Sequence, residues 1–215
     1  MTRLLSLVSL TICLIAFSNA AGAAKTKDMM PAPQPVIVEP VATFAGGCFW
    51  SMQRHFDAVA GVTATRVGYT GGPEKDPTYS EVSSEKTGHA EALEVTFDPA
   101  KVSYEKLLDV YWHYIDPTTK NGQFCDFGPS YRTAIFTHGA EQMAAAEASK
   151  AAIEASGVLK GRPIMTQIEE ADIFWPAESY HQEFYKKNPV RYMSYNIGCG
   201  REGMLKRIWG DKAGH

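Results

Sequence analysis

The pattern of apolar and polar residues begins with a short strand that leads into a helix. Val41–Ala45 has the mostly apolar composition of a buried strand, and it ends at two glycines, Gly46 and Gly47. Apolar side chains then recur at helical spacing from Cys48 to Val59. Glycine lets a backbone turn sharply, so the pattern predicts a strand, a tight turn and a helix that opens with a cysteine.

The next elements repeat this alternation. Val62–Tyr69 is rich in Thr, Val and Tyr and predicts a second strand, and Leu93–Phe97 alternates apolar with polar residues as a third. A helix is predicted from the cap at Ser103 to Ile115, and Tyr131–Thr137 is a fourth strand. The order strand, helix, strand, strand, helix, strand is the split βαβ arrangement of ferredoxin-like folds.

The remaining chain adds a helix at Ala140–Ala155, a short strand near Ile164–Ile168 and a helix at Ala177–Lys187. The end of the chain, Asn188–His215, is predicted to be irregular except near Met204–Trp209. Two polar stretches, 76–88 and 118–130, are predicted surface loops. We therefore expect an α+β fold, a two-layer ferredoxin-like (split βαβ) sandwich with an added helix, an added strand and an irregular C-terminal tail.

The first 40 residues differ in composition from the rest. Arg3 precedes an apolar run, Leu4–Phe17, and small residues that suit cleavage follow it. We interpret residues 1–23 as a signal peptide, 24–40 as a flexible leader and 41–215 as a single catalytic domain. An uncleaved anchor is the alternative, but the run is short for a membrane span. Export would place the protein in the periplasm of a bacterium.

Composition narrows the possible functions. Removal of residues 1–23 leaves twenty basic and twenty-four acidic side chains, a balance that argues against nucleic acid or an anionic membrane as partner. It also leaves three cysteines, Cys48, Cys125 and Cys199, which suit one exchanging pair and a spare thiol. No cysteine or histidine pair has zinc-ligand spacing, so we expect no metal site.

Cys48 is the candidate reactive group. At the start of a helix, the free N–H groups and the helix dipole favour an anion, so we expect the pKa of this thiol to fall below its free value. A small buried cysteine behind an ordinary turn is the alternative.

Six short motifs occur in order along the chain: Gly47-Cys48-Phe49-Trp50, Asp76-Pro77-Thr78-Tyr79, Thr87-Gly88-His89-Ala90-Glu91, Asp116-Pro117-Thr118, Asp126 to Arg132, and Tyr180-His181-Gln182. Together they resemble the peptide methionine sulfoxide reductase A family, whose members reduce the S epimer of methionine sulfoxide. The resemblance runs from about Thr43 to Trp209. It implies thiol-dependent reduction of free and protein-bound methionine S-sulfoxide, which repairs oxidised proteins under oxidative stress.

The resemblance also implies roles for individual residues. Cys48 matches the nucleophile and Glu91 matches the proton donor, a carboxyl that a dry site keeps neutral. Tyr79 and Tyr131 match the tyrosines that donate hydrogen bonds to the sulfoxide oxygen. The remaining matches bind substrate: Phe49 and Trp50 form the apolar pocket for its methyl group, Asp126 helps to anchor its backbone and His181 supports that region.

Recycling is expected to use a second cysteine. Attack by Cys48 leaves a sulfenic acid, which condenses readily with a thiol. Cys199 resembles the resolving cysteine of the family, so the resemblance implies a Cys48–Cys199 disulfide that a thioredoxin-like dithiol reduces. No metal or organic cofactor is expected, and we expect a monomer. Cys125 is interpreted as a passive thiol, with a competing resolver as the alternative.

Two other functions remain open at this point. Cys48 with His89 or His181 as base suits a cysteine hydrolase or acyl transferase. A redox-sensing protein that binds oxidised partners without turnover is the alternative from a different class.

Overall fold

The computed structural model describes residues 40–214. At its start, β1 (Val41–Gly46) leads through Gly47 and Cys48 into α1 (Phe49–Asp57), which confirms the predicted strand, turn and helix. The predicted signal peptide and, apart from Pro40, the predicted leader lie outside the described residues.

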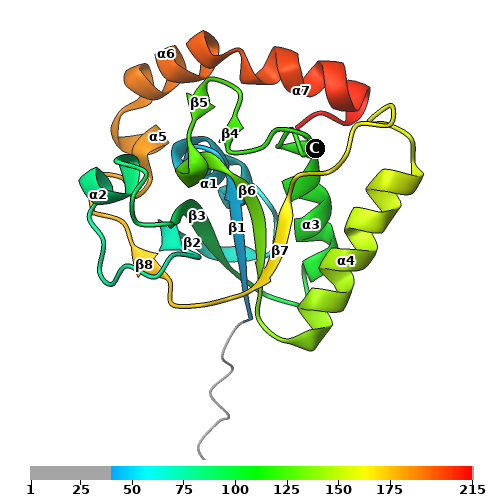
Figure 1. The fold of residues 1–215 in the computed structure, drawn as a ribbon, viewed down its shortest axis with the longest axis horizontal. Coiled ribbons are helices and arrows are strands. Elements are labelled where there is room, and N and C mark those ends of the chain that lie inside the picture. Colours follow the sequence, from blue (N-terminus) through cyan, green and yellow to red (C-terminus); the bar gives the residue numbers. More distant parts are fainter. Residues whose placement is uncertain (1–39, 215) are drawn as a thin grey trace, which may run out of the picture. The chain divides into compact units, whose positions relative to one another are not determined.

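A six-stranded sheet in the order β7-β6-β1-β3-β2-β8 forms the centre of the fold (Figure 1). β2 (Val62–Thr70) pairs antiparallel with β3 (Ala90–Phe97), β3 with β1, and β1 with β6 (Thr133–Thr137). These four strands give the split βαβ order that the sequence predicted. β7 (Gln167–Glu170) extends the sheet parallel to β6, and β8 (Trp175–Pro176) extends it antiparallel to β2.

The main core lies between the sheet and the helices α1 and α3 (Tyr104–His113), with α4 (Ala140–Ala155) packed beside α3. Strand alternation sorts the side chains: Phe44 and Leu93 enter this core, while Ala45 and Ala92 enter a smaller cluster of mostly alanines. Each large apolar side chain buried here stabilises the fold by about 1.5–3 kcal/mol. The packing holds β1, and therefore the cysteine that follows it, in a fixed position.

Short elements complete the end of the sheet at which β1 ends: α2 (Tyr79–Ser83), β4 (Gly122–Gln123), β5 (Asp126–Phe127), the 3₁₀ turns η1 (Pro129–Tyr131) and η2 (Gly210–Lys212), α5 (Phe184–Lys187), α6 (Pro189–Cys199) and α7 (Arg201–Trp209). Figure 1 shows α6 and α7 running across this end. The described residues form one compact unit.

The prediction of an irregular C-terminal tail is wrong, because the tail is mostly helical. Pro189 occupies the first turn of α6, where its missing N–H costs nothing, and Gly200 ends that helix with a φ of +64°. Pro189 and Gly200 are standard start and stop signals, and they mark this helix in the sequence. The same holds for α2, which lies inside a predicted loop and is opened by a capping box between Thr78 and Glu81.

Three other boundaries differ from the prediction. The helix expected from residue 177 covers only Phe184–Lys187, and the strand expected at Ile164–Ile168 lies at Gln167–Glu170. Tyr131 precedes β6 and belongs to η1. The last difference matters for the site, since a tight turn directs the Tyr131 side chain.

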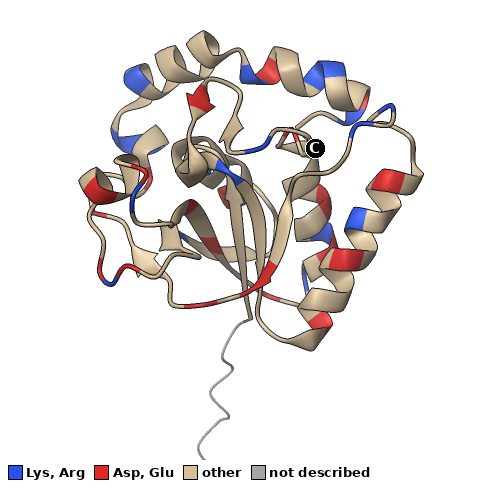
Figure 2. Ribbon diagram, viewed as in Figure 1, with Lys and Arg blue, Asp and Glu red and all other residues tan. Residues whose placement is uncertain are grey.

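Acidic and basic side chains both occur along the outer helices, for example on α4 and α7 (Figure 2). Among the described residues, no helix combines the length and the apolar character that crossing a bilayer requires.

Candidate active site

Cys48 lies at the N-cap of α1, one residue before the helix begins, and its thiol is free. The two preceding glycines are required by close packing. A Cβ on Gly46 would lie 2.6 Å from the Met52 sulfur, and one on Gly47, whose φ is +81°, would lie 2.5 Å from Gln123 Cβ. The turn therefore seats the sulfur tightly at the end of the sheet, where only 8% of the Cys48 surface is exposed.

The expectation that the helix start lowers the pKa of Cys48 is wrong for the resting site. Burial raises the pKa of this thiol well above its ordinary value, and the nearby carboxyls of Glu91 and Asp126 raise it further. Hydrogen bonds from Tyr195 and from the Trp50 backbone lower it, but they do not offset the loss of solvation. Cys48 is therefore a neutral thiol near neutral pH until other groups stabilise its anion.

Glu91 is a buried carboxyl beside the Cys48 turn. It lies on β3 with 2% of its surface exposed, and the backbone N–H of Phe49 donates to its Oε2 at 3.0 Å. Burial raises the pKa of Glu91 to about 8, although the Phe49 hydrogen bond acts in the opposite direction. The carboxyl is thus protonated near pH 7 and is held against the residue that follows Cys48.

Tyr79 and Tyr131 lie near Cys48 and Glu91. Tyr79 opens α2, and its backbone N–H donates to Glu178 Oε1 at 2.9 Å. Burial raises the pKa of Tyr79 to about 12, with further upward contributions from Glu91 and Cys48, and the Tyr131 hydroxyl forms a hydrogen bond with it. Burial together with Glu91 likewise raises the pKa of Tyr131. Both hydroxyls keep their protons and remain hydrogen-bond donors.

An aromatic wall flanks the thiol. The Trp50 ring stacks on Phe184 with centroids 3.6 Å apart, and the Phe49 ring packs 5.1 Å from that of His181. Trp50 Nε1 donates to His181 Nδ1 at 3.0 Å, so His181 carries its proton on Nε2, which has no partner among the described residues. Burial lowers the pKa of His181, which keeps the ring neutral. Phe49, Trp50 and His181 thus form one apolar face with a single free donor.

The alternative use of Cys48 in a hydrolase needs a histidine base, and neither candidate is suited to it. His89 accepts the Gly72 N–H at Nδ1 and contacts the Glu74 carbonyl through Nε2 at 2.7 Å, so its ring is fully engaged by backbone. His181 uses its acceptor nitrogen on Trp50.

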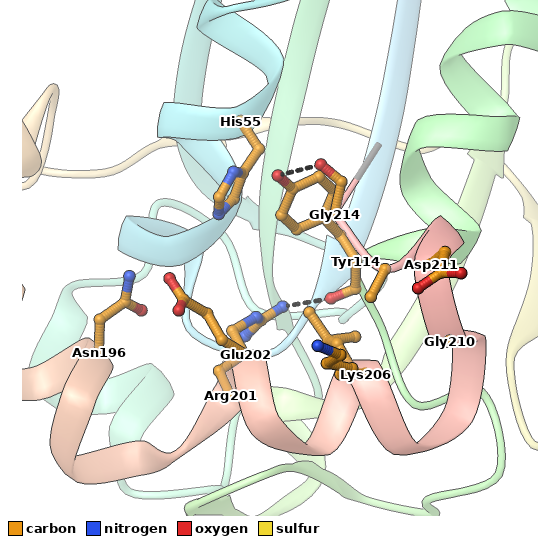
Figure 3. Close-up of a pocket in the computed structure, with 11 residues that line it drawn as sticks. His55, Tyr114, Asn196, Arg201, Glu202, Lys206, Gly210, Asp211 and Gly214 are labelled. Atoms are coloured by element: carbon orange, nitrogen blue, oxygen red, sulfur yellow. Dashed lines mark hydrogen bonds between the residues drawn. The ribbon is translucent and has the colours of Figure 1, made fainter.

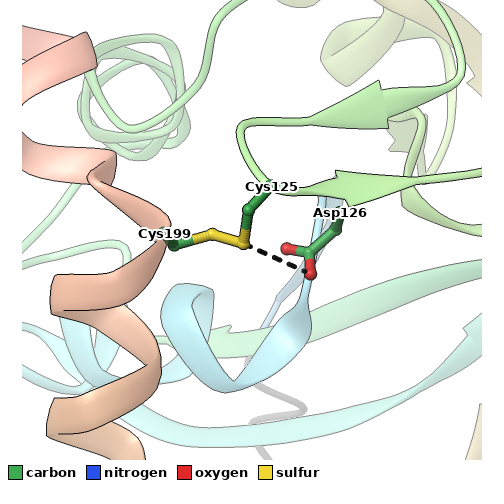
Figure 4. A group of neighbouring side chains, drawn as sticks. All are labelled: Cys125, Asp126 and Cys199. Carbon is green, nitrogen blue, oxygen red and sulfur yellow. Dashed lines mark hydrogen bonds between the residues drawn. A yellow bond between two sulfur atoms is a disulfide. The ribbon is translucent and has the colours of Figure 1, made fainter.

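Cys125 and Cys199 form a disulfide with a Cα–Cα distance of 5.1 Å, and Cys48 is the free cysteine of the described chain (Figure 4). The structure therefore holds a pairing other than the expected Cys48–Cys199 disulfide, and the interpretation of Cys125 as a passive thiol is wrong. Asp126 Oδ1 lies 3.8 Å from the Cys125 sulfur. A disulfide sulfur carries no hydrogen, so this is a contact between two acceptors.

Tyr195 is a site residue that the sequence analysis missed. Its hydroxyl donates to Asp126 Oδ2, and Tyr195 also lowers the pKa of the Cys48 thiol. It lies on α6 one helical turn before Cys199, so the helix that carries the disulfide also contacts the free thiol. Recognition of Pro189–Cys199 as a helix would have placed Tyr195 and Cys199 on one face.

The chemistry of these parts is that of a thiol-dependent oxidoreductase. One buried sulfur is free to react, a neutral carboxyl can protonate a leaving oxygen, and a second pair of sulfurs can be oxidised in turn. Five side chains of the site influence one another's pKa: Cys48, Glu91, Tyr79, Tyr131 and Asp126. Cys199 is linked to this group by its disulfide with Cys125, which precedes Asp126, and by Tyr195 on the same helix.

Comparisons with known proteins agree with this class. The family model for peptide methionine sulfoxide reductase matches residues 40–213. The chain is 55% identical over 172 residues to peptide methionine sulfoxide reductase MsrA of Bacillus licheniformis, covering 80% of this chain and 94% of the relative. It is 52% identical over 172 residues to the MsrA of Bacillus subtilis, covering 80% and 97%.

Solved structures are similar as well. Methionine sulfoxide reductase A of Corynebacterium diphtheriae superposes with a TM-score of 0.67 at 30% identity, covering 75% of this chain and 84% of that one. Reduced Mxr1 of Saccharomyces cerevisiae gives a TM-score of 0.66 at 31% identity, covering 71% and 87%. The chain belongs to the peptide methionine sulfoxide reductase A family, and it is an oxidoreductase that reduces methionine S-sulfoxide at the expense of thiols.

Proposed function

We propose that Cys48 is the nucleophile of this reductase, that Glu91 is its proton donor and that Tyr79 and Tyr131 bind the sulfoxide oxygen. The observation that carries the proposal is the position of a buried, neutral Glu91 against the Phe49 amide, next to Cys48. A sulfoxide sulfur becomes a good electrophile only as its oxygen is protonated, and this carboxyl holds the proton that is needed.

The first step balances with these groups alone. The Cys48 sulfur attacks the sulfoxide sulfur while Glu91 transfers its proton to the oxygen, and the thiol proton returns to Glu91. The S–S bond made by this attack and the S–O bond of the substrate then break as the hydroxyl group transfers to the Cys48 sulfur, giving methionine and a Cys48 sulfenic acid. The methionine sulfur gains two electrons and the Cys48 sulfur loses two. Tyr79 and Tyr131 stabilise the oxygen while it carries negative charge.

Two disulfides then follow in sequence. The Cys199 thiol attacks the Cys48 sulfenic sulfur, a Cys48–Cys199 bond forms and water leaves. The Cys125 thiolate attacks the Cys199 sulfur, which forms the Cys125–Cys199 disulfide and returns Cys48 as a thiol. The Cys125–Cys199 pairing in the structure supports this order. An external thioredoxin-like dithiol reduces that disulfide, and the cycle balances with thiols alone.

The aromatic wall suits the substrate's methyl group. Phe49 and Trp50 supply apolar faces, and His181 fixes the Trp50 ring. Asp126 is positioned by Tyr195 to accept an N–H from the substrate backbone. Both free and peptide-bound methionine S-sulfoxide carry the groups that this arrangement recognises.

Export to the periplasm is also part of the proposal. Its support is the basic start, apolar run and small residues within positions 1–23. Fractionation of bacterial cells expressing the full chain, followed by sequencing of the mature N-terminus, tests it: recovery of uncleaved protein from the cytosolic fraction would contradict export.

The experiment that tests the cysteine roles is a mass measurement. The reduced protein is mixed with methionine S-sulfoxide without any reductant, the reaction is stopped with an alkylating reagent, and the linked peptides are mapped over time. We expect Cys48–Cys199 to appear first and Cys125–Cys199 to replace it. A first linkage between Cys48 and Cys125 would overturn the assigned order, and no linkage involving Cys48 would overturn its role as nucleophile.

A further inference from the structure

Arg201 is a buried cation that the mechanism above does not use. It opens α7 two residues after Cys199, and only 3% of its surface is exposed. Its Nη2 donates to the Gly46 carbonyl at 3.0 Å and to the Tyr114 carbonyl at 2.8 Å, the second of which Figure 3 shows. Gly46 is the last residue of β1, so the guanidinium is bonded to the turn that carries Cys48.

The same guanidinium also contacts the segment of the third cysteine. Its central carbon lies 4.5 Å from the centre of the Phe124 ring, and Phe124 directly precedes Cys125. One side chain therefore contacts the turn before Cys48 and the residue before Cys125, and it lies two residues beyond Cys199. The segments of Cys48, Cys125 and Cys199 therefore meet at this cation.

Arg201 also has hydrogen-bonding capacity to spare. Its Nε and Nη1 have no partner among the described residues, although a buried charge is costly without partners. Burial lowers the pKa of Arg201, and Tyr195, Cys48 and Asp126 act in the opposite direction. His55, which lines the same cavity of about 430 Å³, is kept neutral because burial and then Arg201 lower its pKa to about 3. The positive charge thus resides on Arg201.

The carboxyl groups that face Cys48 from the surrounding elements disfavour its anion. Glu91 on β3 and Asp126 on β5 raise the pKa of the thiol, and Tyr195 on α6 lowers it. Tyr79 on α2 and Tyr131 at η1 are neutral hydroxyls near it. A thiol with a raised pKa is a poor leaving group in disulfide exchange, because it must depart as a thiolate.

We propose that Arg201 is a positioning residue that stabilises Cys48 as the leaving thiolate, and so directs the disulfide from Cys48–Cys199 to Cys125–Cys199. This inference rests on the proposed function. In the exchange, Cys125 attacks the Cys199 sulfur, the Cys48–Cys199 bond breaks, and Cys48 departs with the bonding electron pair beside the Arg201 charge. A Cβ on Gly198 or Gly200 would meet no atom within 4 Å, so Cys199 lies between two unpacked glycines while Arg201 stays anchored.

The test separates charge from hydrogen bonding. Arg201→Gln removes the charge but keeps a donor, Arg201→Lys keeps the charge, and Arg207→Gln on the exposed side of the same helix is the matched control. Each variant is given methionine S-sulfoxide without reductant, and the ratio of the two disulfides is mapped. A second measurement follows alkylation of Cys48 against pH in a Cys125→Ser/Cys199→Ser background.

We expect Arg201→Gln to shift the ratio at least about tenfold towards Cys48–Cys199 and to move the alkylation midpoint up by about one pH unit. Arg201→Lys and Arg207→Gln should match the parent protein. Equal ratios and midpoints in Arg201→Gln and Arg207→Gln would overturn the inference.

If circular dichroism shows that Arg201→Gln does not fold, the Cys48 alkylation midpoint of Arg201→Lys tests the inference. An unchanged alkylation midpoint then supports the charge role, and a raised midpoint with the charge retained contradicts it. A parent protein that forms no methionine would instead refute the proposed function, whatever the Arg201 variants do.

Discussion

The three cysteines within residues 40–214 lie in two contrasting settings. Cys48 is free and buried, and it is held between the central strand β1 and the first turn of α1. Cys125 is exposed beside a hairpin of two-residue strands, and Cys199, although buried, ends a helix between two glycines that have space for a side chain. Attack on the substrate requires a dry, fixed sulfur, whereas exchange of disulfides requires sulfurs that can change partners. The two settings therefore match the two tasks that we propose for these cysteines.

The largest effect is expected when the buried sulfur of Cys48 is removed. Cys48→Ser should lower sulfoxide reduction by roughly 10⁴-fold or more, because no other thiol faces the neutral carboxyl. Methionine released per chain is measured in excess dithiothreitol, with Cys125→Ser as the control. Substantial release of methionine by Cys48→Ser would show that Cys125 or Cys199 is the nucleophile instead.

Glu91→Gln should lower the rate by about 100- to 10,000-fold, because the proposed proton donor is lost. Since Glu91 keeps its proton up to about pH 8, the wild-type acid is available throughout the range below that value. The variant must rely on solvent acid, so its deficit should widen as pH rises towards about 8. Rates of the first turnover across this range provide the test, and a deficit independent of pH would argue against proton donation.

Cys199→Ser should leave the first turnover unchanged and slow dithiol-driven cycling by at least about tenfold, because the Cys48 sulfenic acid then lacks its proposed resolving thiol. Burst and steady-state release of methionine separate the two effects. Cycling at the full rate in Cys199→Ser, together with its loss in Cys125→Ser, would assign resolution to Cys125.

The smallest effect concerns stability. The folded chain keeps a proton on Glu91 that the unfolded chain releases above about pH 4.5, so wild-type stability falls as pH rises from there to about 8. Glu91→Gln lacks this dependence and should gain on the wild type by roughly 1 kcal/mol per pH unit over that range. Urea unfolding of both proteins measures the difference, and a constant gap would show that Glu91 is ionised in the folded chain.

The sequence predicted the surroundings of Cys48 better than those of Cys125 and Cys199. β1, α1 and β3 follow from apolar periodicity and two glycines, and Cys48 and Glu91 belong to motifs within those elements. The raised pKa of Cys48 could not be predicted in this way. Burial by segments distant in the sequence raises this pKa more than the helix start lowers it, and a local sequence pattern does not reveal those segments. The neutral state of Glu91 was expected only from its motif.

The pairing of Cys125 with Cys199 could not be derived from spacing, since three cysteines allow three pairings. It depends on where α6 places Cys199, and that helix was predicted as irregular. Tyr195 and Arg201 were missed for the same reason. Pro189 and Gly200 carry the helix signals, so closer attention to caps would have recovered α6, whereas the contact of Arg201 with Gly46 required the folded chain.

A titration of the Glu91 carboxyl tests the central claim most directly. The infrared band of the protonated carboxyl is followed against pH as a difference between the wild type and Glu91→Gln. The structure predicts that the band persists through neutral pH and disappears with a midpoint near 8. A midpoint near 4.5, the ordinary value for glutamate, would contradict the assignment of Glu91 as the proton donor.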